Sequence, residues 1–230
     1  MALILRNIWY RRNRMVFENK FLSPTSIVQM SLSGYEDIKL ARERREEYGF
    51  QAANNVDSRR GRGWKKPEGK QLKVNFDAVL KESTKKLGLG VIIRDCRGEV
   101  FAAASLRRTL SYGAYGAECT ALWEAMILCE ELGIGEVIFE GDAKIVIDAV
   151  SSGERDDSSL GHLVENLQQK LNSHSRWKLA FIHREGNEVA HQLAKLALHG
   201  ENDMYWVEEG PEAITSQLSI DKMYRELVTI

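Results

Sequence analysis

The sequence predicts an α/β fold in which helices cover both faces of a mixed five-stranded sheet. Residues 72–80 alternate apolar and polar side chains, and strand-like segments follow at 88–95 and 99–108, so we expect three antiparallel strands here. The segment 136–142 holds an unbroken apolar run, as buried parallel strands do. Helical and strand-like segments then alternate to residue 200, which indicates that the last two strands are parallel.

The helices of this region are indicated by apolar spacing and by stop signals. Residues 116–133 place Leu122, Ala125 and Cys129 on one stripe and end at Gly133, a residue type that commonly terminates helices. The order of elements is therefore three strands, helix, strand, two helices, strand and helix. The remaining expected elements are helices at 143–153, 159–173 and 187–200 and a fifth strand at 176–185.

The rest of the chain divides around this domain, which we place at residues 71–200. Apolar faces within residues 1–50 indicate a helical N-terminal extension, whereas residues 51–70 combine Gly, Asn, Ser and basic side chains without periodicity, as a linker does. Residues 201–230 carry an excess of acidic side chains, and we expect an acidic C-terminal tail. The sequence leaves open whether the extension packs on this domain or on another chain, and so leaves the oligomeric state open.

Composition argues against a membrane protein and favours a reducing compartment. The 230 residues are 43% hydrophobic and 28% charged, and no apolar run approaches the roughly 18 residues that cross a bilayer. The three cysteines lack a C-x-x-C spacing, which favours reduced thiols in a nuclear or cytoplasmic protein. The Arg-rich start also fits an organelle transit peptide, an alternative that we favour less.

Positive charge gathers in the linker, although the formal net charge of the chain is only −1. A basic linker beside a domain can attract phosphates, but a solvated flexible linker has the same composition. We take five of its side chains as candidate nucleic-acid contacts: Arg59, Arg60, Arg62, Lys65 and Lys66.

Three carboxylates stand at unusual positions in the expected elements. Asp77 lies mid-strand on the polar face, Glu118 heads the apolar stripe of its helix, and Asp142 directly follows the buried strand. Each has a structural alternative: a solvated strand face for Asp77, a favourable first-turn acid for Glu118, and a helix N-cap for Asp142. Together, carboxylates of this kind in one small domain suit Mg²⁺, and several around one point suit a pair of ions.

The segment "GNEVAHQLAK" at 186–195 raises a question about His191. Val189 and Leu193 lie on the apolar face of a helix, whereas Asn187 and His191 recur every fourth residue on a different stripe. A lone histidine on a helix is most often a surface residue, so the segment by itself does not assign a role to His191.

Five stretches resemble the ribonuclease H fold in their order and spacing: "WKKPEGKQLKVNFDA", "GLGVIIRDCRGEV", "AECTALWEA", "VIFEGDAKIV" and "HREGNEVAHQLAKLA". Residues 64–199 are similar to the reverse-transcriptase-like ribonuclease H domain of plant non-LTR retroelement-derived proteins. The resemblance implies a metal-dependent endonuclease that hydrolyses the RNA strand of RNA–DNA hybrids with two Mg²⁺ ions. It also implies that Asp77, Glu118 and Asp142 are catalytic metal ligands, and that His191 stands where the family has a fourth aspartate.

Other positions depart from the family pattern as well. Ala78 stands where the family usually has glycine, Lys144 stands where an amide side chain reads the substrate, and only His183 or Arg184 can replace the family's mobile histidine. The family's basic handle is absent, and the basic linker is our candidate substitute. We expect Lys144, His183 and Arg184, together with Ala78 and Asn187, to contact the hybrid.

Histidine in place of the fourth acid is the most consequential departure. Neutral imidazole is a softer ligand than carboxylate and brings no negative charge, so we expect slow activity in which Mn²⁺ is preferred over Mg²⁺. Two alternatives stay open: a non-catalytic nucleic-acid-binding module that keeps the fold, and a domesticated retroelement remnant.

Overall fold

The computed structural model of the chain describes residues 62–109, 113–154 and 160–223, together with Thr25. Apart from Thr25, the N-terminal extension expected at 1–50 lies outside the described residues, as do Arg59 and Arg60. None of the described helices is long and apolar enough to cross a membrane.

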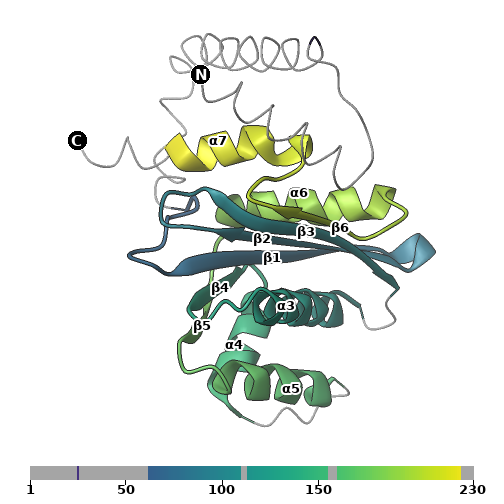
Figure 1. Cartoon of the computed structure of the whole chain (residues 1–230). Coiled ribbons are helices and arrows are strands. Elements are labelled where there is room, and N and C mark those ends of the chain that lie inside the picture. Colours follow the sequence, from purple (N-terminus) through teal and green to yellow (C-terminus); the bar gives the residue numbers. More distant parts are fainter. Residues whose placement is uncertain (1–24, 26–61, 110–112, 155–159, 224–230) are drawn as a thin grey trace, which may run out of the picture. The chain divides into compact units, whose positions relative to one another are not determined.

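A six-stranded mixed sheet with the strand order β5-β4-β1-β2-β3-β6 forms the centre of the described part (Figure 1). β1, β2, β3 and β6 are antiparallel neighbours, whereas β4 pairs in parallel with both β1 and β5. The mixed α/β class is confirmed. The strands are β1 (Leu72–Lys81), β2 (Lys86–Arg94), β3 (Val100–Thr109), β4 (Val137–Gly141), β5 (Trp177–Phe181) and β6 (Met204–Val207), and the 3-10 helix η2 (Glu82–Thr84) links the first two.

The expected count of five strands is wrong, because β6 adds a sixth strand along β3. The sequence "MYWV" is apolar and aromatic, a composition that favours strands, but it is short and lies within an acid-rich segment. Trp206 packs against the apolar cluster that contains Ile92, which holds β6 on the sheet. The chain then continues through the 3-10 helix η3 (Glu212–Ile214) into α7 (Thr215–Met223).

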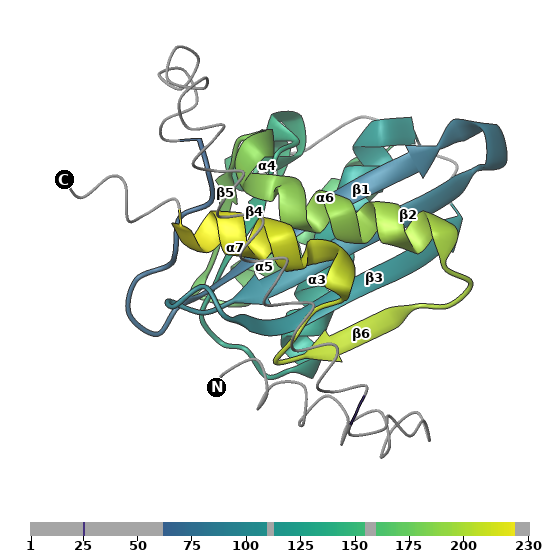
Figure 2. The same ribbon diagram turned by 90° about the horizontal axis from the view of Figure 1, so that it is seen from above.

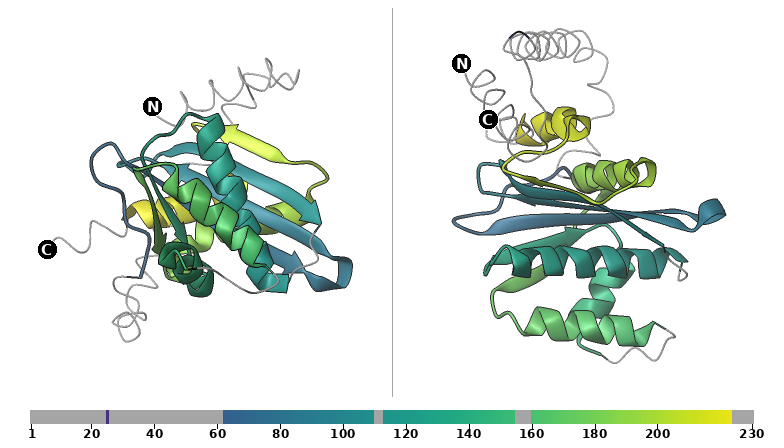
Figure 3. Two further views of the ribbon diagram at one scale, coloured as in Figure 1. Left: turned by 90° about the horizontal axis from the view of Figure 1, so that it is seen from below. Right: turned by 45° about the vertical axis from the view of Figure 1, so that its right-hand side comes forward.

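One face of the sheet is covered by α3 (Gly113–Glu131), with α4 (Lys144–Ser152) and α5 (Gly161–Asn172) on the same side (Figure 3). The apolar side chains that alternate along β1 point to this face. Val74 and Phe76 are fully buried there in one cluster with Leu122 of α3. This larger apolar core fixes the orientation of α3, the helix that carries Glu118.

The opposite face is covered by α6 (Arg184–His199), which crosses β2 at very short range (Figure 2). Gly88 and Gly90 of β2 permit this approach, because a Cβ at either position would lie only 2.0 Å from a carbonyl oxygen of α6. Ser105 of β3 adds a hydrogen bond, donating Oγ to the carbonyl of Leu193 at 2.9 Å. The polar side chains of α6 are therefore placed by direct backbone contact with the sheet.

Polar residues on this second face of the sheet are buried, although a solvated strand face was an alternative for Asp77 of β1. Arg94 and Asn75 are both fully buried, and Nη2 of Arg94 donates to Oδ1 of Asn75 at 2.8 Å. Nη1 of Arg94 pairs with Oδ2 of Asp221 in α7 at 2.6 Å, and the Trp64 ring stacks on the guanidinium at 3.5 Å. These contacts attach both Trp64, from the expected linker, and α7, from the expected tail, to the sheet.

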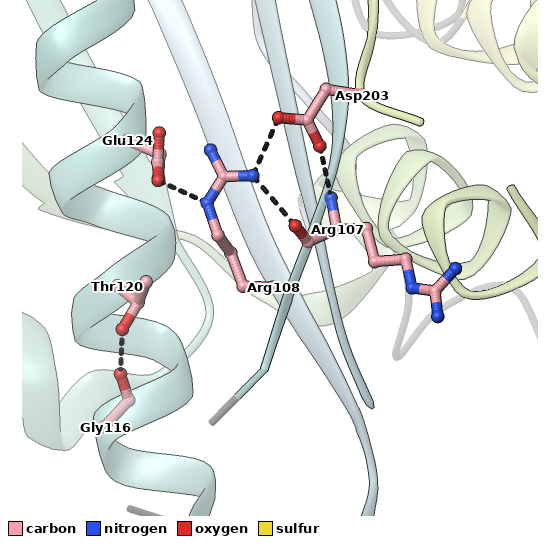
Figure 4. Close-up of polar contacts among 6 residues, drawn as sticks. All are labelled: Arg107, Arg108, Gly116, Thr120, Glu124 and Asp203. Atoms are coloured by element: carbon pink, nitrogen blue, oxygen red, sulfur yellow. Dashed lines mark hydrogen bonds and ion pairs between the residues drawn. The ribbon is translucent and has the colours of Figure 1, made fainter. Parts of the chain in front are cut away.

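A second ion-pair cluster joins β3 to α3 and to the loop between α6 and β6 (Figure 4). Arg108 donates Nε to Glu124 of α3 at 2.8 Å and Nη1 to Asp203 at 2.7 Å. The backbone N–H of Arg107 donates to the same Asp203 carboxylate at 2.8 Å. The edge of the sheet that receives β6 is thereby linked to the helix carrying Glu118.

Candidate metal centre

Three elements bring Asp77, Glu118 and Asp142 to one point. One carboxylate oxygen from each residue lies within 4.8 Å of the others. Asp77 lies mid-way along β1, Glu118 lies in the second turn of α3, and Asp142 follows the last residue of β4. Pairing between β4 and β1 ends at Asn75, so Asp77 lies just beyond the paired stretch and Glu118 can reach it from the α3 side.

Glu118 is the most strongly perturbed of the three acids. Burial raises the pKa of Glu118 to about 9, and the negative charges of Asp77 and Asp142 add to the effect. The backbone N–H of Ala78 donates to its carboxylate and opposes the rise, as does the positive charge of Arg184. Oε2 of Glu118 is buried and has no hydrogen-bond partner among the described residues. A buried carboxylate oxygen without a donor is what a site for a cation requires.

Asp77 lies between the acid cluster and α6. Burial raises the pKa of Asp77, while the hydrogen bond from His191 lowers it and the charge of Asp142 raises it. Nδ1 of His191 donates to Oδ2 of Asp77 at 2.7 Å. On the other side of the ring, Nη2 of Arg184 lies 3.4 Å from Nε2 of His191. His191 is therefore a direct neighbour of the cluster and not an incidental surface histidine.

Asn187 connects α6 to Asp142. Its side chain is only 1% exposed, and Nδ2 donates to the carbonyl of Phe76 at 2.9 Å and to Oδ1 of Asp142 at 3.2 Å. The N-cap of α4 is Ala143, without a side-chain capping bond, so Asp142 does not act as the helix cap. Asp142 is instead held toward the cluster by Asn187.

The three carboxylates fit one divalent cation of the hard, oxygen-preferring type. They come from rigid elements, Glu118 presents an unpaired buried oxygen, and their mutual repulsion is relieved by a central positive charge. His191 differs, because its two ring nitrogens face Asp77 and Arg184.

The other candidate residues near α4 and α6 have local contacts of their own. The backbone of Arg62 lies beside Gly186 in the first turn of α6, and Arg184 begins that helix. His183 is exposed, and its ring meets that of Phe181 edge-on at 5.1 Å between centroids. Lys144 follows Asp142 closely, but its ammonium group pairs with Asp148 at 2.8 Å.

Two basic residues of the expected linker are placed in the structure without contact to the acids. Lys65 is exposed, and the side chain of Lys66 lies beside Gly98 in the turn between β2 and β3. The structure therefore brings together the three acids, His191, Asn187, Arg184 and the backbone of Ala78, but it does not bring Lys66 to them.

Glu140 is a buried acid near the cluster that the sequence argument did not single out. It is 6% exposed and lies on β4 two residues before Asp142. Oε1 of Glu140 pairs with Lys73 at 2.6 Å, and Asn75 donates to Oε2 at 3.3 Å. A glutamate inside the apolar run "VIFEGD" is the signal that could have revealed it. Because both oxygens have donors, Glu140 is satisfied without a metal.

Comparison with known proteins assigns the chain to a family. Residues 75–197, more than half of the chain, match the family described as "Reverse transcriptase-like". The chain belongs to this family. A relative from Arabidopsis thaliana, named "Putative ribonuclease H protein", is 24% identical over 164 residues, which are 70% of this chain and 26% of the relative. The chain thus spans about a quarter of the length of that relative.

Solved structures show that the described part of this reverse-transcriptase-like chain has the ribonuclease H fold. Ribonuclease H1 from the archaeon Halobacterium salinarum is similar with a TM-score of 0.51 and 19% identity, over 56% of this chain and 98% of that one. LC11-RNase H1, isolated from compost by a metagenomic approach, gives a TM-score of 0.51 and 18% identity, over 57% and 97%. Both likenesses establish the fold, and the chemistry has to be argued from the site.

Proposed function

We propose that this reverse-transcriptase-like domain is a metal-dependent endonuclease that hydrolyses the RNA strand of RNA–DNA hybrids. The observation that carries the proposal is the convergence of Asp77, Glu118 and Asp142, with one oxygen of each within 4.8 Å of the others. A structure of LC11-RNase H1 in complex with RNA/DNA hybrid, similar with a TM-score of 0.50, supports the choice of substrate.

The chemistry assigned to the site is hydrolysis of a phosphodiester bond. A bound Mg²⁺ or Mn²⁺ would supply positive charge at the scissile phosphate and favour the ionisation of an attacking water. Asp77, Glu118 and Asp142 would hold that ion, and Asn187 orients Asp142. The water oxygen bonds to phosphorus as the bond to the 3′ oxygen breaks. The 3′ oxygen takes a proton, so one water is consumed and the ends are a 3′-hydroxyl and a 5′-phosphate.

Substrate contacts are proposed for residues around the acid cluster. Arg184 begins α6 and His183 directly precedes it. Lys144 begins α4, two residues after Asp142, and Arg62 lies beside the first turn of α6. Their cationic or ring nitrogen groups suit phosphate oxygens, while discrimination of RNA requires contacts to 2′-hydroxyls across the shallow minor groove. Lys65, Arg59 and Arg60 extend this basic stretch in sequence, although the last two lie outside the described residues.

His191 brings no negative charge to the site, so we expect the enzyme to be slow with Mg²⁺ and less impaired with Mn²⁺, the softer of the two ions. We expect His191→Asp to raise the Mg²⁺-dependent rate about tenfold, by restoring a carboxylate beside Asp77. Rates measured with each ion for both proteins check this. A His191→Asp protein that is folded but no faster with Mg²⁺ would contradict it.

A second candidate function is a non-catalytic module that binds nucleic acid. The observation that favours it is the 2.7 Å hydrogen bond between His191 and Asp77, which engages one of the two carboxylate oxygens of Asp77. Under this alternative the chain binds hybrids but does not cut them.

The experiment that separates the two candidates uses a 5′-labelled RNA strand paired with DNA, and RNA–RNA and DNA–DNA duplexes as controls. The nuclease proposal predicts cleavage of the hybrid alone, in Mn²⁺ and more slowly in Mg²⁺, and none in EDTA. Hybrid binding in a gel-shift assay, without cleavage in either ion, would support the second candidate.

A further inference from the structure

Both ring nitrogens of His191 are engaged in this arrangement, so neither is free to bind a second metal ion. Nδ1 carries the proton donated to Asp77 at 2.7 Å, so the remaining lone pair is on Nε2. Nε2 faces Nη2 of Arg184 at 3.4 Å. A cation therefore already lies on the side of the site where a fourth ligand would act.

Arg184 also acts electrostatically on the acids themselves. Its positive charge lowers the pKa of Glu118 against the larger raising effects of burial and of the two aspartates. Arg184 is the first residue of α6, and its side chain is exposed, so the guanidinium is free to meet a substrate from solvent. Guanidinium is permanently charged, and its geometry matches two phosphate oxygens.

We propose that Arg184, held at the site by His191, takes the place of a second divalent ion, so that the chain works with a single bound metal. This rests on the proposed nuclease function. Arg184 is then a catalytic residue that contacts a non-bridging oxygen of the scissile phosphate. Its charge balances the negative charge that grows while the bond between phosphorus and the 3′ oxygen breaks.

The pairing of His191 with Arg184 is consistent in its chemistry. A neutral imidazole with its proton on Nδ1 accepts a hydrogen bond from Arg184 at Nε2, but it lacks the negative charge with which an aspartate at 191 would attract a second divalent ion. The carboxylates of Asp77, Glu118 and Asp142 then serve one ion, in keeping with the fit of that cluster.

Counting bound Mn²⁺ tests the proposal without relying on activity. The EPR signal of free Mn²⁺ is titrated with the full chain saturated by a hybrid whose RNA strand carries 2′-O-methyl groups, with saturation verified by fluorescence anisotropy. We expect one tightly bound Mn²⁺ per chain, both for the wild type and for Arg184→Ala. The double variant Arg184→Ala/His191→Asp should bind two. Lys195→Ala, which removes an exposed charge from the same helix, is the matched control and should bind one.

Cleavage rates complete the test. Arg184→Ala should cut an unmodified hybrid about 10²-fold more slowly than the wild type and Lys195→Ala, and the double variant should regain part of this loss. Two tightly bound Mn²⁺ in the wild type, or an Arg184→Ala rate equal to that of Lys195→Ala, would overturn the inference. Absence of any cleavage by the wild type would instead overturn the proposed function, because the Mn²⁺ count stands independently of it.

Discussion

At the scale of single residues, the centre depends on carboxylates kept close together at an electrostatic cost. Burial raises the pKa of both Glu118 and Asp77, the charges of Asp77 and Asp142 raise the pKa of Glu118 further, and the charge of Asp142 raises that of Asp77. In the folded chain without metal, Glu118 is therefore protonated at neutral pH. A cation reverses this preference, so binding of a divalent metal should release a proton from Glu118 and tighten as the pH rises toward 9.

The raised pKa of Glu118 has a definite sign in the stability of the metal-free protein. Below the unfolded pKa of about 4.5 both states are protonated, and between that value and about 9 only the unfolded state loses its proton. The free energy of unfolding should thus fall as the pH rises through this window. Glu118→Gln should remove that slope and raise the free energy of unfolding by about 1–3 kcal/mol at pH 8, measured by urea denaturation in EDTA. A wild-type pH slope that persists unchanged in Glu118→Gln would contradict this assignment.

The sequence identified most residues of this site but not the contacts between their side chains. Asp77 stood out as a carboxylate in the middle of a strand, Glu118 as one heading an apolar stripe, and Asp142 as one directly after a buried strand, and family resemblance placed His191 beside them. The hydrogen bond between His191 and Asp77 and the contact of Arg184 with Nε2 of His191 depend on side-chain rotamers across 114 and 7 residues of separation. Periodicity carries no information on such contacts.

At the scale of elements, α6 supplies the residues that contact the acids of the metal centre. It carries Arg184, Asn187 and His191, and it packs closely against β2. The alternation of β1 predicted which of its residues face α3. The burial of polar side chains on the second face was harder to foresee, because the partners of Asn75 in β1 and of Arg94 in β2 include residues contributed by β4 and α7.

The close approach of α6 makes Gly90 sensitive to any side chain. A Cβ at Gly90 would lie 2.0 Å from the carbonyl oxygen of Ala190, next to His191, so α6 has to shift. Gly90→Ala should lower the free energy of unfolding by about 1–3 kcal/mol or more and should weaken Mn²⁺ binding. Gly135→Ala is the control, since its Cβ would meet only Arg176 at an ordinary 3.6 Å. Equal free energies of unfolding for the two variants in urea denaturation would show that α6 can move away from Gly90 at little cost.

At the scale of the whole described molecule, segments on both sides of the expected domain belong to the fold. Trp64 stacks on Arg94, β6 extends the sheet, and α7 supplies Asp221 to the buried guanidinium. Composition did not reveal that these segments belong to the fold, because a basic stretch resembles a linker and an acid-rich stretch resembles a tail. The partners of Trp64 and Asp221 cannot be recognised from composition.

Asp221 should therefore contribute to the stability of the whole sheet. Asp221→Ala leaves the fully buried Arg94 without its carboxylate, and we expect the free energy of unfolding to fall by about 3–5 kcal/mol. Lys222→Ala breaks the neighbouring exposed pair with Glu99 and should cost less than about 1 kcal/mol. Thermal denaturation of the two variants side by side provides the measurement, and a loss in Asp221→Ala no larger than in Lys222→Ala would mean that α7 is not anchored by this pair.

We infer that Asp77, Glu118 and Asp142 form a metal centre that cuts RNA in hybrids. The most direct test compares the rate of hybrid cleavage in Mn²⁺ between the wild type and Asp77→Asn. Asp77→Asn keeps the size of the side chain but removes a metal ligand. We predict metal-dependent cleavage by the wild type and a rate at least about 10²-fold lower for a folded Asp77→Asn protein. Equal rates for the two proteins, or no cleavage by the wild type in either Mn²⁺ or Mg²⁺, would contradict the claim.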